Sequence, residues 1–118
     1  MRELDRDTFD DAVSGGPLLV DFWAPWCKPC TALEPILGEL EARVPVAKLN
    51  VDEHPGIASR YDVLSIPTVM LFAGGEPRGT LVGFRPKAHF ENWLEPLLGS
   101  VERGSPAEQT DARETRAS

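Results

Sequence analysis

The sequence has few of the residues from which disulfide frameworks and metal centres are built. It contains two cysteines and two histidines among 118 residues. Two cysteines form at most one disulfide, and a bridge that closes over two intervening residues restrains little of the unfolded chain. Structural zinc takes about four ligands, and only His54 and His89 could join the cysteines. We therefore expect neither a structural staple nor a metal site, whether zinc or an iron-sulfur cluster shared between two chains.

Long apolar runs and an excess of basic residues are also missing. No segment reaches the roughly 20 apolar residues of a membrane-spanning helix, and residues 1–7 lack the apolar stretch of a signal peptide. The net charge is −7, and the 12 Lys and Arg residues are scattered, whereas nucleic-acid binding needs a concentrated basic face. We therefore expect a cytoplasmic protein that binds neither membrane nor nucleic acid.

The chain has the length and composition of one globular domain followed by a polar tail. It is 42% hydrophobic and 26% charged, as in ordinary globular proteins. From residue 99 onward the only strongly apolar residue is Val101, so this segment cannot offset the entropy cost of ordering. The sequence predicts a domain over residues 1–98 and a disordered tail over residues 99–118.

Strand and helix patterns alternate in the first half of the domain, and a hairpin follows in the second half. Apolar runs predict strands, and apolar residues at helical spacing predict helices. Pro77 suits an edge strand, whereas Pro96 should bend or end the last helix. The predicted strands cover residues 18–24, 46–51, 68–73 and 80–83, and the predicted helices lie around 5–13, 27–44, 55–61 and 90–98. This order predicts an α/β fold with a central mixed β-sheet flanked by helices on both faces.

The two cysteines lie where the first long predicted strand gives way to a helix. A thiol becomes a nucleophile as thiolate, and the N-terminus of a helix stabilises that anion at Cys27. Cys30 lies one turn further into the helix, where burial would keep its proton in place until it is needed. Pro29 is tolerated in the first helical turn and stiffens the loop between the cysteines. This arrangement predicts that Cys27 attacks a disulfide and that Cys30 resolves the intermediate.

Several segments in the same order resemble the motifs of the thioredoxin family. The likeness covers roughly residues 4–98 and rests on VDFWAPWCKPC at 20–30, KLNVD at 48–52, SIPT at 65–68, Pro35 and Gly83. The resemblance implies the thioredoxin fold and the reduction of protein disulfides by dithiol-disulfide exchange through Cys27 and Cys30, with no bound cofactor.

The same resemblance implies partners. They are disulfide-containing substrate proteins and a flavoprotein thioredoxin reductase, which would restore the dithiol with NADPH, and the expected state is a monomer. Two alternatives stay open at this point. One is an enzyme that works in the oxidising or isomerising direction, and the other is a non-catalytic protein-binding module with the same fold.

Asp21 is a carboxylate in the middle of an apolar predicted strand. Alternation puts it on the same face as Leu19 and Trp23, where a charge is unusual. One interpretation pairs it with Lys48, which is the only charge in its own predicted strand. By the resemblance, Asp21 instead helps to move the proton of Cys30, and Lys48 modulates that step.

The remaining candidates surround the cysteines. The resemblance implies a cis bond before Pro67, which would bring the Ile66 backbone beside Cys27 to pair with an extended substrate chain. Trp26, next to the nucleophile, then belongs to an apolar docking surface rather than to the core. The predicted docking surface consists of Trp26, Ile66, Pro67 and Gly83.

The chain departs from the family pattern at three places. Lys28 stands where the family usually has Gly, and an added cation should lower the pKa of Cys27 and make the pair more oxidising. Thr31 stands where many members carry a cation. Only residues 1–4 remain for the first edge strand, which we expect to be shortened or absent.

Overall fold

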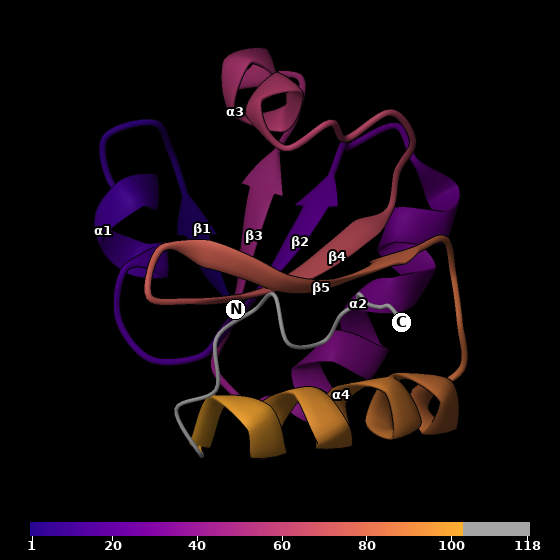
Figure 1. Ribbon diagram of the computed structural model, residues 1–118. Helices are drawn as coiled ribbons and strands as arrows, with labels where there is room; N and C mark the ends of the chain where they lie inside the picture. The colour runs from indigo at the N-terminus through magenta and orange to yellow at the C-terminus, as the bar shows by residue number, and fades with distance from the viewer. Residues whose placement is uncertain (103–118) are drawn as a thin grey trace.

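The computed structural model describes residues 1–102, which form one five-stranded sheet and four helices (Figure 1). The sheet order is β1-β3-β2-β4-β5. The strands are β1 (Arg2–Leu4), β2 (Leu18–Trp23), β3 (Val46–Asn50), β4 (Thr68–Ala73) and β5 (Glu76–Val82), and the helices are α1 (Phe9–Val13), α2 (Lys28–Leu40), α3 (Pro55–Arg60) and α4 (Lys87–Glu102).

The sheet is mixed, as predicted. Strands β1, β3 and β2 are parallel, whereas β4 runs antiparallel to β2 and β5 antiparallel to β4. The carboxyl ends of β2 and β3 point toward the end of the molecule where α2 begins and α3 lies (Figure 1). Because binding sites in open sheets lie beyond the carboxyl ends of strands, this end is where a site is expected.

Two hydrophobic clusters cover the two faces of the sheet. On one face, helices α1 and α3 pack on the sheet through Phe9 and Ile57. On the other face, α2 and α4 pack on it through Leu33, Leu37, Phe90 and Leu94. Strand β2 is buried on both faces, which explains its continuous apolar run. The prediction of helices on both faces is confirmed.

The edges of the sheet differ from the sequence expectation in detail. The first edge strand is present but short, since β1 has three residues that pair in parallel with β3. At the other edge β5 begins at Glu76, four residues earlier than predicted, and Pro77 lies inside it. An edge strand tolerates this proline because one side of the strand has no partner for an N–H group.

The last helix is longer than predicted. Pro96 lies within α4 and does not end it, and α4 continues to Glu102, so the expectation that the tail begins at residue 99 is wrong for residues 99–102. The reason is packing, because Leu98 is buried and Val101 packs against the same cluster as α2. The rest of the predicted tail, residues 103–118, lies outside the described residues. No helix within residues 1–102 is long and apolar enough to cross a membrane.

Candidate functional site

The two cysteines form a disulfide at the start of α2. Cys27 is the N-cap residue, in an extended conformation, and its Sγ accepts a hydrogen bond from the backbone N–H of Cys30 at 3.2 Å. Cys27 is 4% exposed, whereas Cys30 is completely buried. The outer sulfur therefore lies where a free helical N–H group and the helix dipole stabilise a negative charge.

The residues between and after the cysteines build the first turn of α2. Pro29 lies in this turn. Its missing N–H costs no hydrogen bond there, because the N–H groups of the first helical turn have no partner within the helix. Lys28 directly follows Cys27 in the chain, is exposed and forms no ion pair among residues 1–102. The hydroxyl of Thr31 donates a hydrogen bond to the carbonyl oxygen of Cys27 at 3.3 Å.

Asp21 lies on β2 and is completely buried. Neither carboxylate oxygen has a hydrogen-bond partner within residues 1–102. The pKa of Asp21 is raised from its usual 3.8 to about 7. Burial is the largest cause; the positive charge of Lys48 opposes it, and the negative charge of Glu34 acts in the same direction as burial. The carboxyl group can therefore gain and lose a proton near neutral pH.

An ion pair between Asp21 and Lys48, one of the two interpretations of the sequence, is not formed. The two residues are direct partners in the register of β2 and β3, but the Lys48 ammonium pairs with the carboxylate of Glu34 on α2. It also lies 4.0 Å from the centre of the Trp23 ring, in a cation–π contact. Trp23 thus packs both against the cluster that contains the two cysteines and against the Lys48 ammonium.

The loop before β4 brings the SIPT motif, residues 65–68, beside the cysteines. The Ile66–Pro67 peptide bond is cis, as predicted, and Ile66 packs against the cluster that contains both cysteines. The N–H of Gly83 donates a hydrogen bond to the carbonyl oxygen of Pro67 at 2.8 Å. Gly83 has φ = +92°, a conformation that L side chains rarely adopt. The three predicted loop residues therefore meet at one end of the sheet.

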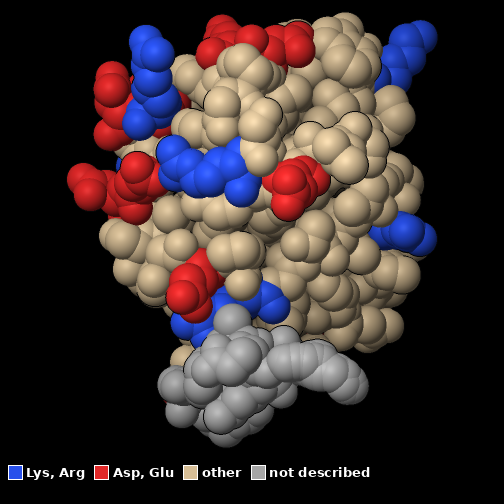
Figure 2. All heavy atoms as spheres, turned by 45° about the horizontal axis from the view of Figure 1, so that its top comes forward, with Lys and Arg blue, Asp and Glu red and all other residues tan. Residues whose placement is uncertain are grey.

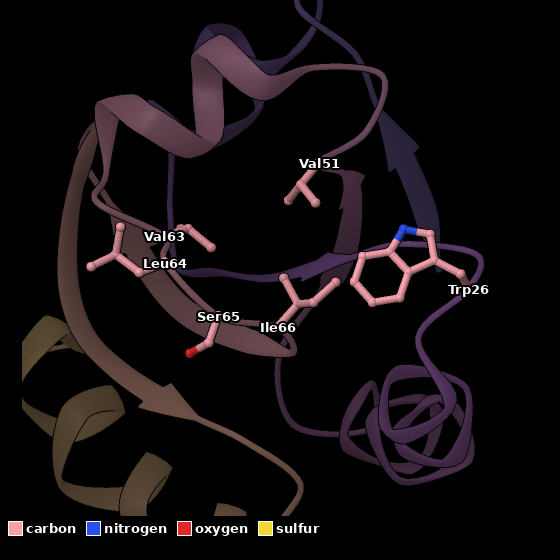
Figure 3. A pocket seen from close by; sticks show the side chains of 6 residues that line it. All are labelled: Trp26, Val51, Val63, Leu64, Ser65 and Ile66. Atoms are coloured by element: carbon pink, nitrogen blue, oxygen red, sulfur yellow. The ribbon is translucent and has the colours of Figure 1, made fainter.

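Trp26 and Ile66 line an apolar hollow of about 390 Å³ next to the cysteines. Figure 3 shows the Trp26 ring at one side of this hollow and Leu64 at the other, with Ile66 between them. Trp26 is 68% exposed and Leu64 is 94% exposed. The indole N–H of Trp26 donates a hydrogen bond to the carboxylate of Asp52 at 2.8 Å, which fixes the ring in its exposed position.

The surface at this end of the molecule has no single sign of charge. Figure 2 shows the end where α3 lies, turned toward the viewer, with basic and acidic side chains interspersed on one side and a largely uncharged area on the other.

Among residues 1–102, no group of three or more His, Cys, Asp or Glu side chains could hold a metal ion.

Three residues of this region were missed from the sequence. Glu34 follows Cys30 by one helical turn, so the spacing could have indicated that both face the same way. Asp52 was noted only as part of a motif, although a polar partner for Trp26 could have been sought there. Leu64 lies in a loop, and no periodic pattern marks a residue in such a position.

Comparison with known proteins gives a consistent result. The family model described as Thioredoxin matches residues 1–96. The thioredoxins of Staphylococcus aureus strains MW2, N315 and COL are each 45% identical to this chain over 94 residues. The aligned part is 76% of this chain and 90% of each relative.

Proposed function

Because the chain belongs to the thioredoxin family, we propose that it serves as a cytoplasmic, monomeric reductase of disulfides in other proteins, recharged by a thioredoxin reductase. Its basic activity is thiol-disulfide oxidoreduction by dithiol-disulfide exchange through Cys27 and Cys30. The observation that carries the mechanism is the position of Cys27 at the N-cap of α2, where its sulfur accepts a helical N–H. This is the place at which a thiolate is stabilised.

In the first step the Cys27 thiolate attacks one sulfur of a substrate disulfide. A bond forms between Cys27 and that sulfur, the substrate disulfide breaks, and the second substrate sulfur leaves as a thiolate. The helix N-terminus and the free ammonium of Lys28 both favour the thiolate form of Cys27. Lys28 thereby makes the pair more oxidising than it would be with a neutral residue.

In the second step Cys30 resolves the mixed disulfide. Its thiol gives a proton to the Asp21 carboxylate, and the resulting thiolate attacks the sulfur of Cys27. The Cys27–Cys30 disulfide forms, the first substrate sulfur leaves as a thiolate, and Asp21 can return its proton to the products. Two electrons have then passed from the dithiol to the substrate. A pKa of about 7 suits Asp21 for this exchange near neutral pH.

The substrate chain docks on the surface around the cysteines. Ile66 packs beside them, and its backbone is the edge along which an extended substrate segment would pair as an added strand. Trp26 and Gly83 form the rest of the docking surface. Pro67, which the sequence also predicts in this surface, is buried next to Ile66 and does not present its side chain to a substrate. The apolar character of the surface fits unfolded or loop segments whose side chains are hydrophobic.

The oxidised protein needs an external source of electrons. The flavoprotein reductase supplies them from NADPH, so the cofactor acts on this chain only indirectly. Family membership supports this step, since the relatives at 45% identity are themselves thioredoxins.

The reduction potential of the cysteine pair tests the proposed direction. The protein is equilibrated in glutathione or dithiothreitol buffers, and the oxidised fraction is followed. We expect a value near the roughly −270 mV typical of thioredoxin, whereas a value near −180 mV or higher would assign an oxidase or isomerase. The absence of a reversible two-electron couple would leave only the protein-binding alternative.

Lys28→Gly measures the share of the local cation in this potential. We expect its potential to be more negative than that of the wild type, because the reduced thiolate loses a stabilising charge. Lys87→Gly is the matched control, since Lys87 is also the first residue of a helix, α4, and pairs with Glu39 at the end of α2 opposite to the cysteines. An unchanged potential in Lys28→Gly would show that Lys28 is merely solvated.

A further inference from the structure

Four polar groups meet on the side of β2 and β3 that α2 covers. Asp21 and Lys48 are neighbours in the parallel register of the two strands. Cys30 and Glu34 are four residues apart on α2, so they lie on the same face of the helix, one turn apart. The Lys48 ammonium thus has two carboxylates near it, one from the sheet and one from the helix.

The Lys48 ammonium pairs with the carboxylate on the helix, Glu34, and not with the carboxylate on the sheet, Asp21. It also forms a cation–π contact with Trp23. Both oxygens of Asp21 are left without a hydrogen bond, although Asp21 is its register partner. The Lys48 side chain is only 16% exposed, so water solvates its ammonium poorly. The ammonium therefore pairs with one of two nearby carboxylates, Glu34 or Asp21.

This choice matters for the chemistry of Asp21. A buried carboxylate in direct contact with an ammonium group is held in its ionised form and becomes a poor proton acceptor. A buried carboxylate without a partner binds a proton more readily. The remaining neighbours do not alter this balance, because Val69, its partner on β4, is apolar and Cys30 is neutral in the disulfide.

We propose that Glu34 is a positioning residue, which holds the Lys48 ammonium away from Asp21 and so keeps the buried carboxyl group able to exchange a proton with Cys30. Glu34 touches neither sulfur among the contacts of the site, and it acts through Lys48. The inference rests on the proposed role of Asp21 and adds the element that sets its state. The raised pKa of Asp21 agrees with it, since Glu34 is one of its causes.

The test is a carboxyl-carbon NMR titration of Asp21 in the oxidised protein, where the cysteines do not titrate. In Glu34→Gln the ammonium is released toward Asp21, and a negative charge is lost. We expect the Asp21 midpoint to move toward acid by about one pH unit or more. Glu39→Gln is the matched control, because Glu39 also lies on α2 and pairs with a lysine, Lys87, at 3.1 Å. Its Asp21 midpoint should equal that of the wild type.

A double-mutant cycle separates positioning from simple charge repulsion. In a Lys48→Met background, Glu34→Gln removes only its own charge, so its effect on the Asp21 midpoint should be clearly smaller than in the wild type. Equal shifts in the two backgrounds would overturn the proposal, because Glu34 would then act without Lys48. An unchanged midpoint in Glu34→Gln would overturn it as well.

A kinetic measurement distinguishes this proposal from the function on which it rests. The mixed disulfide between Cys27 and a small thiol is prepared, and release of the thiol by Cys30 is followed against pH. We expect Asp21→Asn to slow the release, and Glu34→Gln to shift its pH profile toward acid. If Asp21→Asn leaves the rate unchanged, the proton-transfer role of Asp21 fails, whereas the NMR titration still decides where Glu34 holds Lys48.

Discussion

Among single residues, Asp21 is one whose burial lowers the stability of the folded protein when it is ionised. A carboxyl group in the interior without a hydrogen-bond partner costs free energy whenever it is ionised. The folded protein therefore binds a proton on Asp21 up to about pH 7, whereas in the unfolded chain the same group loses it near pH 3.8. In the proposed mechanism, the same raised pKa provides the proton acceptor near neutral pH that the resolving step needs.

The pH dependence of stability follows from this difference. Between pH 4 and pH 7 the folded state holds more protons than the unfolded state, so the free energy of unfolding falls as the pH rises. The gap between 3.8 and about 7 corresponds to on the order of 4 kcal/mol. In Asp21→Asn this loss is absent. The stability of the variant relative to wild type should rise by several kcal/mol from pH 4 to pH 8, measured by urea unfolding of the oxidised proteins.

Asp7→Asn serves as the control for this experiment, since Asp7 is exposed. Its stability relative to wild type should stay constant over the same pH range. A pH-independent difference for Asp21→Asn would contradict the burial argument, because it would mean that Asp21 is ionised equally in the folded and unfolded states.

At the scale of elements, α4 shows packing that overrides a local signal. Proline removes one intrahelical hydrogen bond and usually kinks or breaks a helix, at a cost of roughly 3 kcal/mol. The residues beyond Pro96 offset that cost, because they bury apolar surface in the same cluster as α2. Ion pairs between Arg43 and Glu95 and between Lys87 and Glu39 lie along the same contact, but exposed pairs of this kind contribute little.

Leu98→Ala tests whether the end of α4 is held by the core. Leu98 is 6% exposed, so its truncation should lower the free energy of unfolding by about 2 to 5 kcal/mol. Leu64→Ala is the same chemical change at a side chain that is 94% exposed, and it should change stability by less than about 0.5 kcal/mol. Similar, small effects for both variants would mean that the helix ends near Pro96 in solution.

At the scale of the whole molecule, the active end is assembled from segments far apart in the chain. Cys27 comes from the turn after β2, Ile66 from the loop before β4, and Gly83 from the end of β5. The sheet brings them together because β4 pairs antiparallel with β2 and so begins where β2 ends.

Both edges are poor templates for a second sheet. Strand β1 has only three residues, and β5 carries Pro77, which has no N–H to donate. We therefore expect a monomer, with a sedimentation mass near 13.0 kDa that does not change with protein concentration. A mass that rises toward twice this value over the micromolar range would show that an edge or the apolar hollow recruits a second copy.

Local patterns in the chain are enough to predict most of the helices and strands and the reactive cysteine pair. Buried strands and amphipathic helices leave local periodic patterns, so β2 and β4 are predicted to within one residue of their ends, whereas α2 ends at Leu40, four residues before the predicted end. The strand-to-helix junction at Cys27 is equally local. The cis bond before Pro67 could be predicted only through the family motif, because base rates favour the trans isomer.

Which groups of the site pair with one another depends instead on how the helices pack on the sheet. Lys48 has two carboxylates within reach, and the packing of α2 on the sheet, rather than the register of the strands, selects Glu34 and leaves Asp21 alone. The hollow beside Trp26 and the extension of α4 past Pro96 were settled in the same way. Such contacts join elements distant in sequence, and their energies depend on geometry that no local pattern encodes.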